Sequence, residues 1–133
     1  MTATVRTLPP NARVQDAVIE FTRGRYRHLP VLEGDRLVGI VSDRDVLRVV
    51  ASESHDPNGP ISRIMSHRPT TVGPESSLAD AIRQLLHHRI GCLPVVTGSN
   101  VFEGILTTTD LLRALYAVQY WLERQADDDE RGR

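Results

Sequence analysis

The feature that most constrains the fold is a strand-to-helix motif that occurs twice. The first copy covers residues 39–45 and the second covers residues 104–110. Each copy reads as the end of an apolar strand, then a hydroxyl residue, then an aspartate in the first turn of a helix. A Leu-Pro-Val segment precedes both copies, at residues 29–31 and 93–95. Two matched segments of this kind predict two copies of one structural unit.

The repeat extends beyond the motif, because matching residues recur at a fixed offset along the chain. The offset is 64 positions up to the turns near Gly34 and Gly98, and it is 65 positions after them. The matched pairs before the turns include Val14 and Leu78, Asp16 and Asp80, Ala17 and Ala81, and Pro30 and Pro94. The chain of 133 residues therefore consists largely of two tandem copies of one unit.

Each unit is predicted to be β-α-β-β-α, which makes the fold class mixed α/β. Val14, Ala17, Val18 and Phe21 have the spacing of an amphipathic helix, and Gly34 suits a hairpin turn. The elements expected in the first unit are strands at 4–8, 28–32 and 37–41 and helices at 14–21 and 43–51. Those expected in the second unit are strands at 69–72, 92–96 and 101–106 and helices from 78 and over 108–124.

The predicted organisation is two repeats, at residues 1–56 and 67–125, joined by a polar linker at residues 57–66. Ile61, Ile64 and Met65 predict a short helical turn at the end of that linker. Residues 126–133 include four consecutive acidic residues and no apolar periodicity, so we expect a disordered acidic tail. Neither repeat is long enough to bury a generous core alone, so we expect the two to pack together with pseudo-twofold symmetry.

Composition narrows the classes of function. The net charge is −1, which argues against a general nucleic-acid or anionic-membrane binder, and every basic residue is an arginine. Cys92 is the single cysteine, so no internal disulfide can form. No apolar run approaches the roughly 20 residues of a membrane span, and the N-terminus lacks the apolar core of a signal peptide. We therefore expect a cytoplasmic protein. No nucleophile–base pair, metal-ligand set or glycine-rich phosphate loop stands out, which predicts that the chain is not an enzyme.

The doubled motif inside a doubled β-α-β-β-α unit resembles a tandem pair of CBS domains (cystathionine-β-synthase domains, the Bateman module) over residues 2–118. The resemblance implies two clefts that bind adenosine-containing ligands such as AMP, ADP, ATP or S-adenosylmethionine. It also implies regulation of a separate effector protein, which this chain does not identify.

The motif residues suit such a ligand chemically. An ionised aspartate can accept hydrogen bonds from both hydroxyls of a ribose, and Asp45 and Asp110 are placed for this. A helix N-terminus with a nearby hydroxyl favours phosphate. The residues expected at the hydroxyls or phosphates are Ser42, Thr107, Thr109, Arg44 and Arg27.

The base is expected against the strands. Leu8, Leu29 and Val41 are the apolar candidates in one cleft, and their counterparts Val72, Leu93 and Leu106 are those in the other. The resemblance adds first-strand contacts, the segments before Leu-Pro-Val, and the prolines. The residues expected there are Thr7, Thr71, His28, Gly91, Cys92, Pro30 and Pro94.

A second interpretation needs no ligand. The spacing of Ser42 to Asp45, and of Thr107 to Asp110, is also that of a helix capping box. The runner-up function is therefore a structural dimerisation or interaction protein with vestigial clefts. The last helix carries two apolar stripes, which predicts a homodimer under either interpretation. One stripe is Leu111, Leu115, Val118 and Leu122, and the other is Leu112, Tyr116 and Tyr120.

Overall fold

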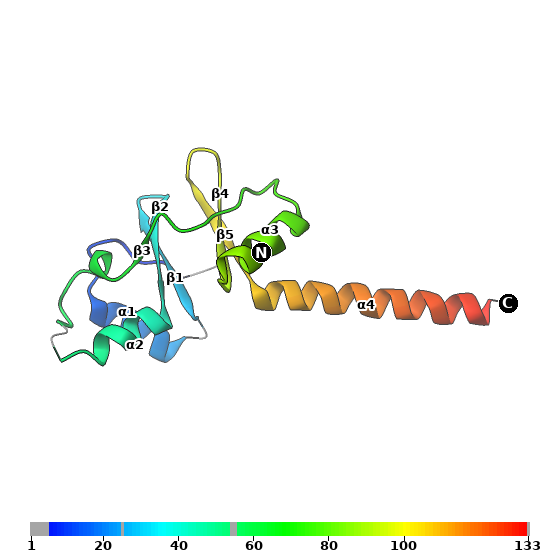
Figure 1. The fold of residues 1–133 in the computed structure, drawn as a ribbon, viewed down its shortest axis with the longest axis horizontal. Helices are drawn as coiled ribbons and strands as arrows, with labels where there is room; N and C mark the ends of the chain where they lie inside the picture. Colours follow the sequence, from blue (N-terminus) through cyan, green and yellow to red (C-terminus); the bar gives the residue numbers. More distant parts are fainter. Residues whose placement is uncertain (1–5, 25, 54–55, 133) are drawn as a thin grey trace.

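Repeat 1 places two helices against one face of a β-hairpin. The computed structural model describes residues 6–24, 26–53 and 56–132. The hairpin consists of β1 (His28–Glu33) and β2 (Arg36–Ser42), and the helices are α1 (Val14–Arg23) and α2 (Asp43–Val50). Figure 1 shows this unit as one lobe of the molecule. The turn is made at Gly34, whose φ of 65° lies in the left-handed region that glycine adopts without strain.

Repeat 2 follows the same order of elements. Helix α3 (Leu78–His88) leads into the hairpin β4 (Cys92–Val96) and β5 (Phe102–Thr107), and α4 (Thr108–Arg131) follows. The mixed α/β class and the doubled order of elements are therefore confirmed. Between the repeats, a 3₁₀ turn, η1 (Ile61–Arg63), confirms the predicted helical turn. A short strand that the sequence did not predict, β3 (Ser66–His67), pairs with β2.

The predicted first strand of each repeat is reduced to a single parallel bridge. Leu8 pairs with Val31, and its counterpart Val72 pairs with Val95. The other expected residues at 4–5 lie outside the described part of the chain. Prolines follow or precede these segments closely, and proline lacks the N–H group that a longer ladder needs.

The pseudo-twofold relation is visible in the hydrogen bonds between the two hairpin ends. The Leu37 amide donates to the Asn100 carbonyl at 3.2 Å, and the Phe102 amide donates to the Asp35 carbonyl at 2.8 Å. At the offset of 65, Leu37 corresponds to Phe102 and Asp35 corresponds to Asn100, so each bond is the equivalent of the other in the opposite repeat. The axis therefore passes between the hairpins, as the repeat predicts.

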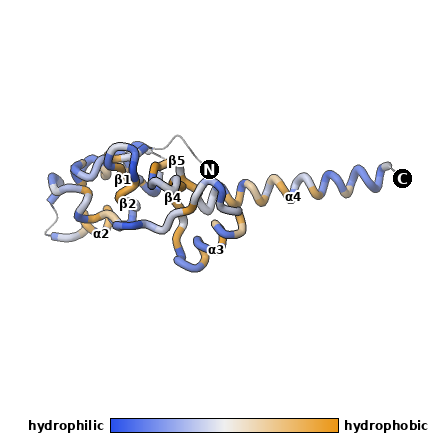
Figure 2. The backbone as a smooth tube through the Cα atoms, turned by 90° about the horizontal axis from the view of Figure 1, so that it is seen from above, coloured by the Kyte–Doolittle hydropathy of each residue, from blue (hydrophilic) through white to orange (hydrophobic). Residues whose placement is uncertain are grey.

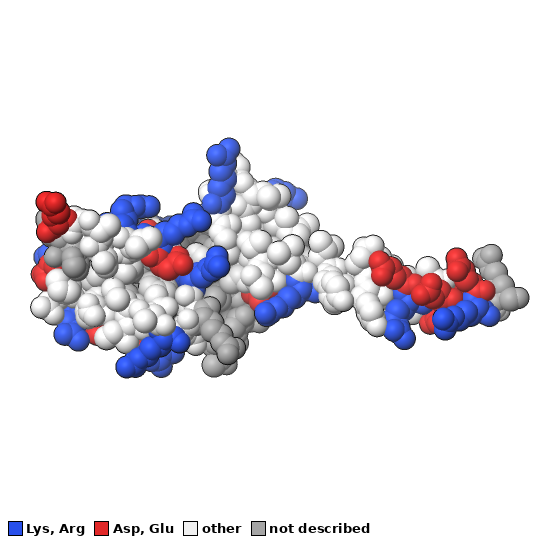
Figure 3. Space-filling model, turned by 90° about the horizontal axis from the view of Figure 1, so that it is seen from below, with Lys and Arg blue, Asp and Glu red and all other residues white. Residues whose placement is uncertain are grey.

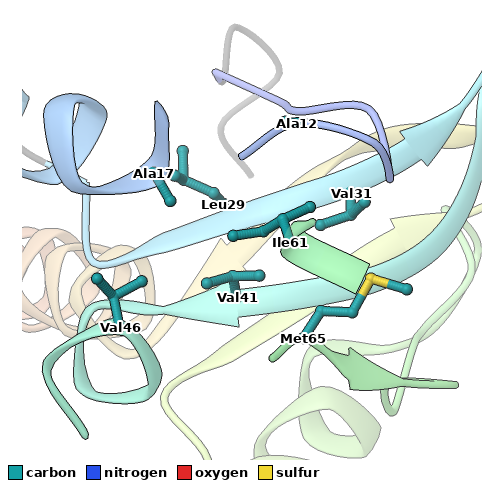
Figure 4. Packing of buried hydrophobic residues seen from close by; sticks show 8 residues of the cluster. All are labelled: Ala12, Ala17, Leu29, Val31, Val41, Val46, Ile61 and Met65. Atoms are coloured by element: carbon teal, nitrogen blue, oxygen red, sulfur yellow. The ribbon is translucent and has the colours of Figure 1, made fainter. Parts of the chain in front are cut away.

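The core of repeat 1 lies between its hairpin and its helices (Figure 4). Leu29, Val31 and Val41 from the strands have no exposed surface. Ile61 from η1 is also fully buried and lies over the same strands. The segment predicted as a linker is thus part of the packing of repeat 1.

Helix α4 corrects the prediction of a disordered tail. Residues 126–131 continue the helix, which projects from the two lobes as a single rod (Figure 1). The Thr107 capping box starts the helix, and no glycine or proline interrupts it before Gly132. Once started, a helix adds one hydrogen bond per residue, so it can continue through a segment that has no apolar face. Among the described residues, no helix is long and apolar enough to span a membrane.

Candidate functional site: a cleft between the repeats

The two copies of the motif open onto one cleft between the repeats. Its volume is about 1050 Å³, which is the size of a large small-molecule site. Asp45 and Asp110, in the first turns of α2 and α4, both line it, as does the connecting segment 66–70. The cleft therefore brings together the residues that the internal repeat singles out.

Each motif aspartate closes a capping box. The Ser42 amide donates to Oδ2 of Asp45 at 2.9 Å, and the Asp45 amide donates to Oγ of Ser42 at 3.1 Å. The Thr107 amide donates to Oδ2 of Asp110 at 3.0 Å, and the Asp110 amide donates to Oγ1 of Thr107 at 3.1 Å. The capping interpretation is thus confirmed for both helices. A carboxylate has about four acceptor sites, so a cap does not prevent it from also accepting bonds from a diol.

A second pair of equivalent bonds holds each helix start to the strand of its own repeat. The Asp43 amide donates to the Arg27 carbonyl at 2.9 Å, and the Thr108 amide donates to the Gly91 carbonyl at 3.1 Å. Arg27 and Gly91 each come directly before the strand that contains Leu-Pro-Val. The two walls of each half-site are therefore joined through the backbone.

Positive charge dominates the cleft. The arginines that line it are Arg27, Arg44, Arg68, Arg89 and Arg113. Within the described residues none of these five forms an ion pair. The acidic residues of the cleft are Asp43, Asp45 and Asp110. Figure 3 shows basic atoms gathered over the middle of the body around a smaller acidic patch. A local excess of arginine in a chain of net charge −1 favours an anionic ligand.

Two of these arginines have an unusual backbone conformation. Arg68 has a φ of 51° and Arg89 a φ of 53°, in the left-handed region that few residues other than glycine adopt. Arg89 ends α3 at its C-cap, and Arg68 lies in the segment that crosses from β3 to repeat 2. Such conformations are concentrated at functional sites, and both residues line the cleft.

The two half-sites differ at one equivalent position. Repeat 1 has His28 there, and repeat 2 has Cys92. Burial lowers the pKa of His28, while the charges of Asp43 and Asp45 oppose that shift. Burial, with a smaller contribution from the charge of Asp110, raises the pKa of the Cys92 thiol to about 12. The repeat 1 half-site therefore has an imidazole where the repeat 2 half-site has a neutral thiol.

Eleven of the predicted site residues line the cleft. They are Arg27, His28, Ser42, Arg44, Asp45, Gly91, Cys92, Pro94, Thr107, Thr109 and Asp110. The structure thus brings the predicted ribose and phosphate residues together, and their contacts with a ligand stay predictions.

The predicted apolar walls need correction. Leu29, Val41 and Leu93 have no exposed surface and belong to the hydrophobic cores. Side chains alternate between the two faces of a strand, so these residues lie on the face opposite to the ligand side. Ile40 and Ile105, each one position away from a predicted residue, line the cleft in their place.

The remaining predicted contacts also lie outside the cleft. Leu8 and Leu106 pack against the two cores, Pro30 is fully buried, and Thr7 is exposed elsewhere. Thr71 and Val72 line a separate depression of about 440 Å³. The first-strand contacts that the resemblance implied are therefore not assembled with the motif aspartates.

Three cleft arginines were not predicted. Arg113 lies three residues after Asp110 on the same helix face, so its position could have been inferred from helical spacing. Arg89 is next to the segment before the second Leu-Pro-Val, where the sequence offered only a weak signal. Arg68 reaches the cleft because β3 turns the chain, and nothing in the sequence marks that strand.

Comparisons with known proteins agree with this architecture. The CBS domain family matches residues 1–52 and 61–117. The CBS domain-containing protein YhcV of Bacillus subtilis is 32% identical over 111 residues, which is 84% of this chain and 79% of that protein. The crystal structure of CBSX2 in complex with AMP has a TM-score of 0.81 and 29% identity, and the match covers 90% of this chain and 94% of that one.

A further solved structure, the CBS domain protein PAE2072 from Pyrobaculum aerophilum complexed with AMP, has a TM-score of 0.74 and 28% identity. The match covers 84% of this chain and 86% of that one. Two matched segments, one in each repeat, and these similarities over most of the chain establish that the chain belongs to the CBS domain family, as a pair of CBS domains.

Proposed function

We propose that the chain is a regulatory module that binds an adenosine phosphate in the cleft between its repeats. The observation that carries the proposal is the pair of motif aspartates, Asp45 and Asp110, at equivalent positions of one cleft. The similar proteins CBSX2 and PAE2072, whose structures contain AMP, support the ligand class. Each aspartate accepts from the two hydroxyls of a ribose while it continues to cap its helix.

The charge of the cleft bears on which adenosine compound is bound. AMP, ADP and ATP carry phosphates, whereas S-adenosylmethionine carries a cationic sulfonium. Five arginines without ion pairs in the described chain favour the phosphates, because a guanidinium binds phosphate through a planar pair of donors. The ligand therefore belongs to the AMP, ADP and ATP group rather than to the sulfonium compounds.

Calorimetric titration of AMP tests the ribose assignment. Asp45→Asn or Asp110→Asn removes a charged acceptor, and a hydrogen bond to a charged group is worth roughly 1.5–3 kcal/mol. The affinity of the altered half-site is expected to fall by about tenfold to a hundredfold. The 2′-deoxy form of AMP is expected to bind the wild-type protein less tightly, because it lacks one of the two hydroxyls.

Asp43→Asn is the matched control. Asp43 lines the same cleft, but its counterpart in repeat 2 is Thr108, so no ribose role is assigned to it. Equal affinity for the ribose and deoxyribose forms, with no loss in either aspartate variant, would show that Asp45 and Asp110 act only as helix caps.

The remaining parts of the proposal concern partners and location. We expect no nucleotide turnover by the isolated chain, action on a separate effector protein, and a cytoplasmic location. We also expect a homodimer, because α2 and α4 expose large apolar side chains such as Leu47 and Leu115. Nucleotide turnover that Asp110→Ala abolishes would contradict the expectation of a non-enzymatic module.

A further inference from the structure

The segment between the repeats, residues 61–70, joins the core of repeat 1 to the cleft. The chain between α2 and α3 crosses from one lobe to the other (Figure 1 and Figure 2). Ile61 and Met65 belong to the repeat 1 core, where Ile61 is fully buried and Met65 is 9% exposed (Figure 4). Residues 66–70, which follow directly, line the cleft. A contact with a ligand in the cleft is therefore only a few residues of backbone away from the repeat 1 core.

Strand β3 holds this segment on the hairpin by a short ladder. The ladder consists of two residue pairs, Gly39 with His67 and Ile40 with Ser66. Both residues of β3 are exposed, and Nε2 of His67 lies 3.0 Å from the Ser62 carbonyl oxygen. Exposed backbone hydrogen bonds with little buried apolar area open at a low cost in free energy. A ligand that binds next to β3 can therefore stabilise its pairing.

Gly39 determines how closely β3 approaches the hairpin. A Cβ atom at position 39 would lie 2.5 Å from Sδ of Met65 and 2.9 Å from the Ser66 carbonyl oxygen. These distances are shorter than van der Waals contact, so any side chain there would push the segment away from β2. The glycine of the first motif therefore places β3, and the residue that follows it, beside the cleft.

Arg68 follows β3 directly and lines the cleft. Its φ of 51° is left-handed, and this conformation costs free energy for a residue that has a side chain. Such conformations persist where the surrounding structure imposes them. Although three aspartates line the same cleft, the Arg68 guanidinium has no ion pair in the part of the chain that the structure describes. At the offset of 64 its counterpart is Thr4, so the repeat supplies one arginine at this position and not two.

We propose that Arg68 binds the phosphate of the nucleotide, and that this contact holds β3 against β2 and closes the segment between the repeats on the ligand. The inference rests on the proposed function and adds the residue that distinguishes a nucleotide from a nucleoside. A guanidinium forms paired hydrogen bonds with phosphate oxygens, which adenosine lacks. AMP therefore stabilises the paired position of β3, whereas adenosine does not.

Calorimetric titration of AMP and of adenosine tests the phosphate contact. Arg68→Gly removes the guanidinium, and glycine adopts the left-handed conformation without strain, so the backbone at this position is kept. The dissociation constant of AMP is expected to rise about tenfold to a hundredfold, and that of adenosine is expected to change by less than about twofold. Arg68→Gln should behave in the same way. Arg63→Gln is its matched control, because Arg63 is an exposed arginine of the same segment that does not line the cleft.

The outcomes separate this inference from the proposed function. If the wild-type protein binds neither AMP nor adenosine, the proposed function fails, and this inference fails with it. If the wild-type protein binds AMP and Arg68→Gly binds it equally well, only the role of Arg68 is overturned. If Arg68→Gly loses affinity for AMP and adenosine alike, the residue acts on the fold and not on the phosphate, which also overturns its role.

Hydrogen exchange measured by mass spectrometry tests the closure of the segment. Saturating AMP is expected to slow exchange about tenfold in peptides that cover residues 64–70 of the wild-type protein. Saturating adenosine should leave that exchange unchanged, and so should saturating AMP in Arg68→Gly. No slowing by AMP, or equal slowing by AMP and adenosine, overturns the closure. Slowing of the same size in α1 would show that the ligand stabilises the whole fold, and this result also overturns it.

Gly39→Ala tests the placement of Arg68. The added methyl group displaces β3, so the ratio of the adenosine to the AMP dissociation constant is expected to fall towards its value in Arg68→Gly. A general loss of stability lowers both affinities and does not change this ratio. In the Arg68→Gly background, Gly39→Ala is expected to leave the ratio unchanged, because the guanidinium that it displaces is absent. A wild-type ratio in Gly39→Ala, or an equal fall in both backgrounds, overturns the positioning role of Gly39.

Discussion

The two repeats share one order of elements, yet they bury very different amounts of apolar side chain. Val14 at the start of α1 is 3% exposed, and its counterpart Leu78 at the start of α3 is 53% exposed. The repeat 1 core includes residues from both helices, both strands and η1, whereas the repeat 2 core consists of Ala81, Leu85 and Leu93 with partly buried neighbours. The same order of secondary-structure elements therefore gives a well-buried core in repeat 1 and a less buried core in repeat 2.

The segment between the repeats explains the difference. The Val14 amide donates to the Gly59 carbonyl at 2.9 Å, and the Ile61 amide donates to the Ala12 carbonyl at 2.7 Å. These bonds hold the segment over the start of α1 and place Ile61 in the core. Among the described residues, no segment covers the start of α3 in this way, and Leu78 stays exposed. A core of this fold is thus completed by the chain between the repeats as well as by the repeats themselves.

The largest expected effect is a loss of stability in the repeat 1 core, which the segment between the repeats covers. Ile61→Ala removes a fully buried side chain and leaves a cavity between η1 and the strands, which costs about 2–5 kcal/mol of the free energy of unfolding. Leu78→Ala, at an exposed position of repeat 2, is expected to change stability by about 0.5 kcal/mol or less. Urea unfolding monitored by circular dichroism measures both. Equal losses of the free energy of unfolding in the two variants would show that the repeat 2 core is buried as well as the repeat 1 core.

A smaller effect is expected at the helix caps, which the repeats have in common. Ser42→Ala removes the acceptor for the Asp45 amide and is expected to cost about 1 kcal/mol. Thr107→Ala removes the equivalent bond at α4, but it should lower global stability less, because α4 buries no residue fully. Its effect should instead be a loss of helical signal at 222 nm. A larger loss of the free energy of unfolding for Thr107→Ala than for Ser42→Ala would contradict the conclusion that repeat 1 is the better buried repeat.

The smallest expected effect is a pH dependence of the free energy of unfolding. It comes from His28, which repeat 2 replaces with Cys92. Burial lowers the pKa of His28, so below about pH 6.5 the unfolded chain binds a proton that the folded chain resists. The free energy of unfolding therefore falls as the pH drops from 7.5 to 5.5. His28→Gln should reduce that fall, and His87→Gln, at an exposed position on α3, is the control. An identical pH dependence for wild type and His28→Gln would show that His28 does not contribute to acid sensitivity.

Sequence reasoning succeeded where a local pattern determines the structure. The apolar runs and turn residues predict the hairpin strands, and β4 at Cys92–Val96 matches its expected bounds. The hydroxyl and aspartate of each motif form the capping boxes that their spacing indicates. The fixed offset between the repeats also predicts the pseudo-twofold relation, because equivalent residues must take equivalent places about the axis.

The failures have physical causes that a single sequence does not reveal. Period-two alternation shows that Val41 and Ile40 are on opposite faces of their strand but does not say which face meets the ligand. The arginine at position 68 reaches the cleft through the pairing of β3, which is a long-range contact of two residues. The acidic end of α4 is helical although it has no apolar stripe, and periodicity detects only helices that pack against something.

Helix α4 begins in the cleft and ends far from it, so a small rotation of its first turn produces a large displacement of its outer end. Its 24 residues span about 36 Å, and its first turn contains the Asp110 carboxylate that the proposed ribose would contact. A change of only about 5° in the direction of the helix at Thr108 would move its outer end by about 3 Å. Occupancy of a small site can thereby become a displacement large enough for another molecule to sense.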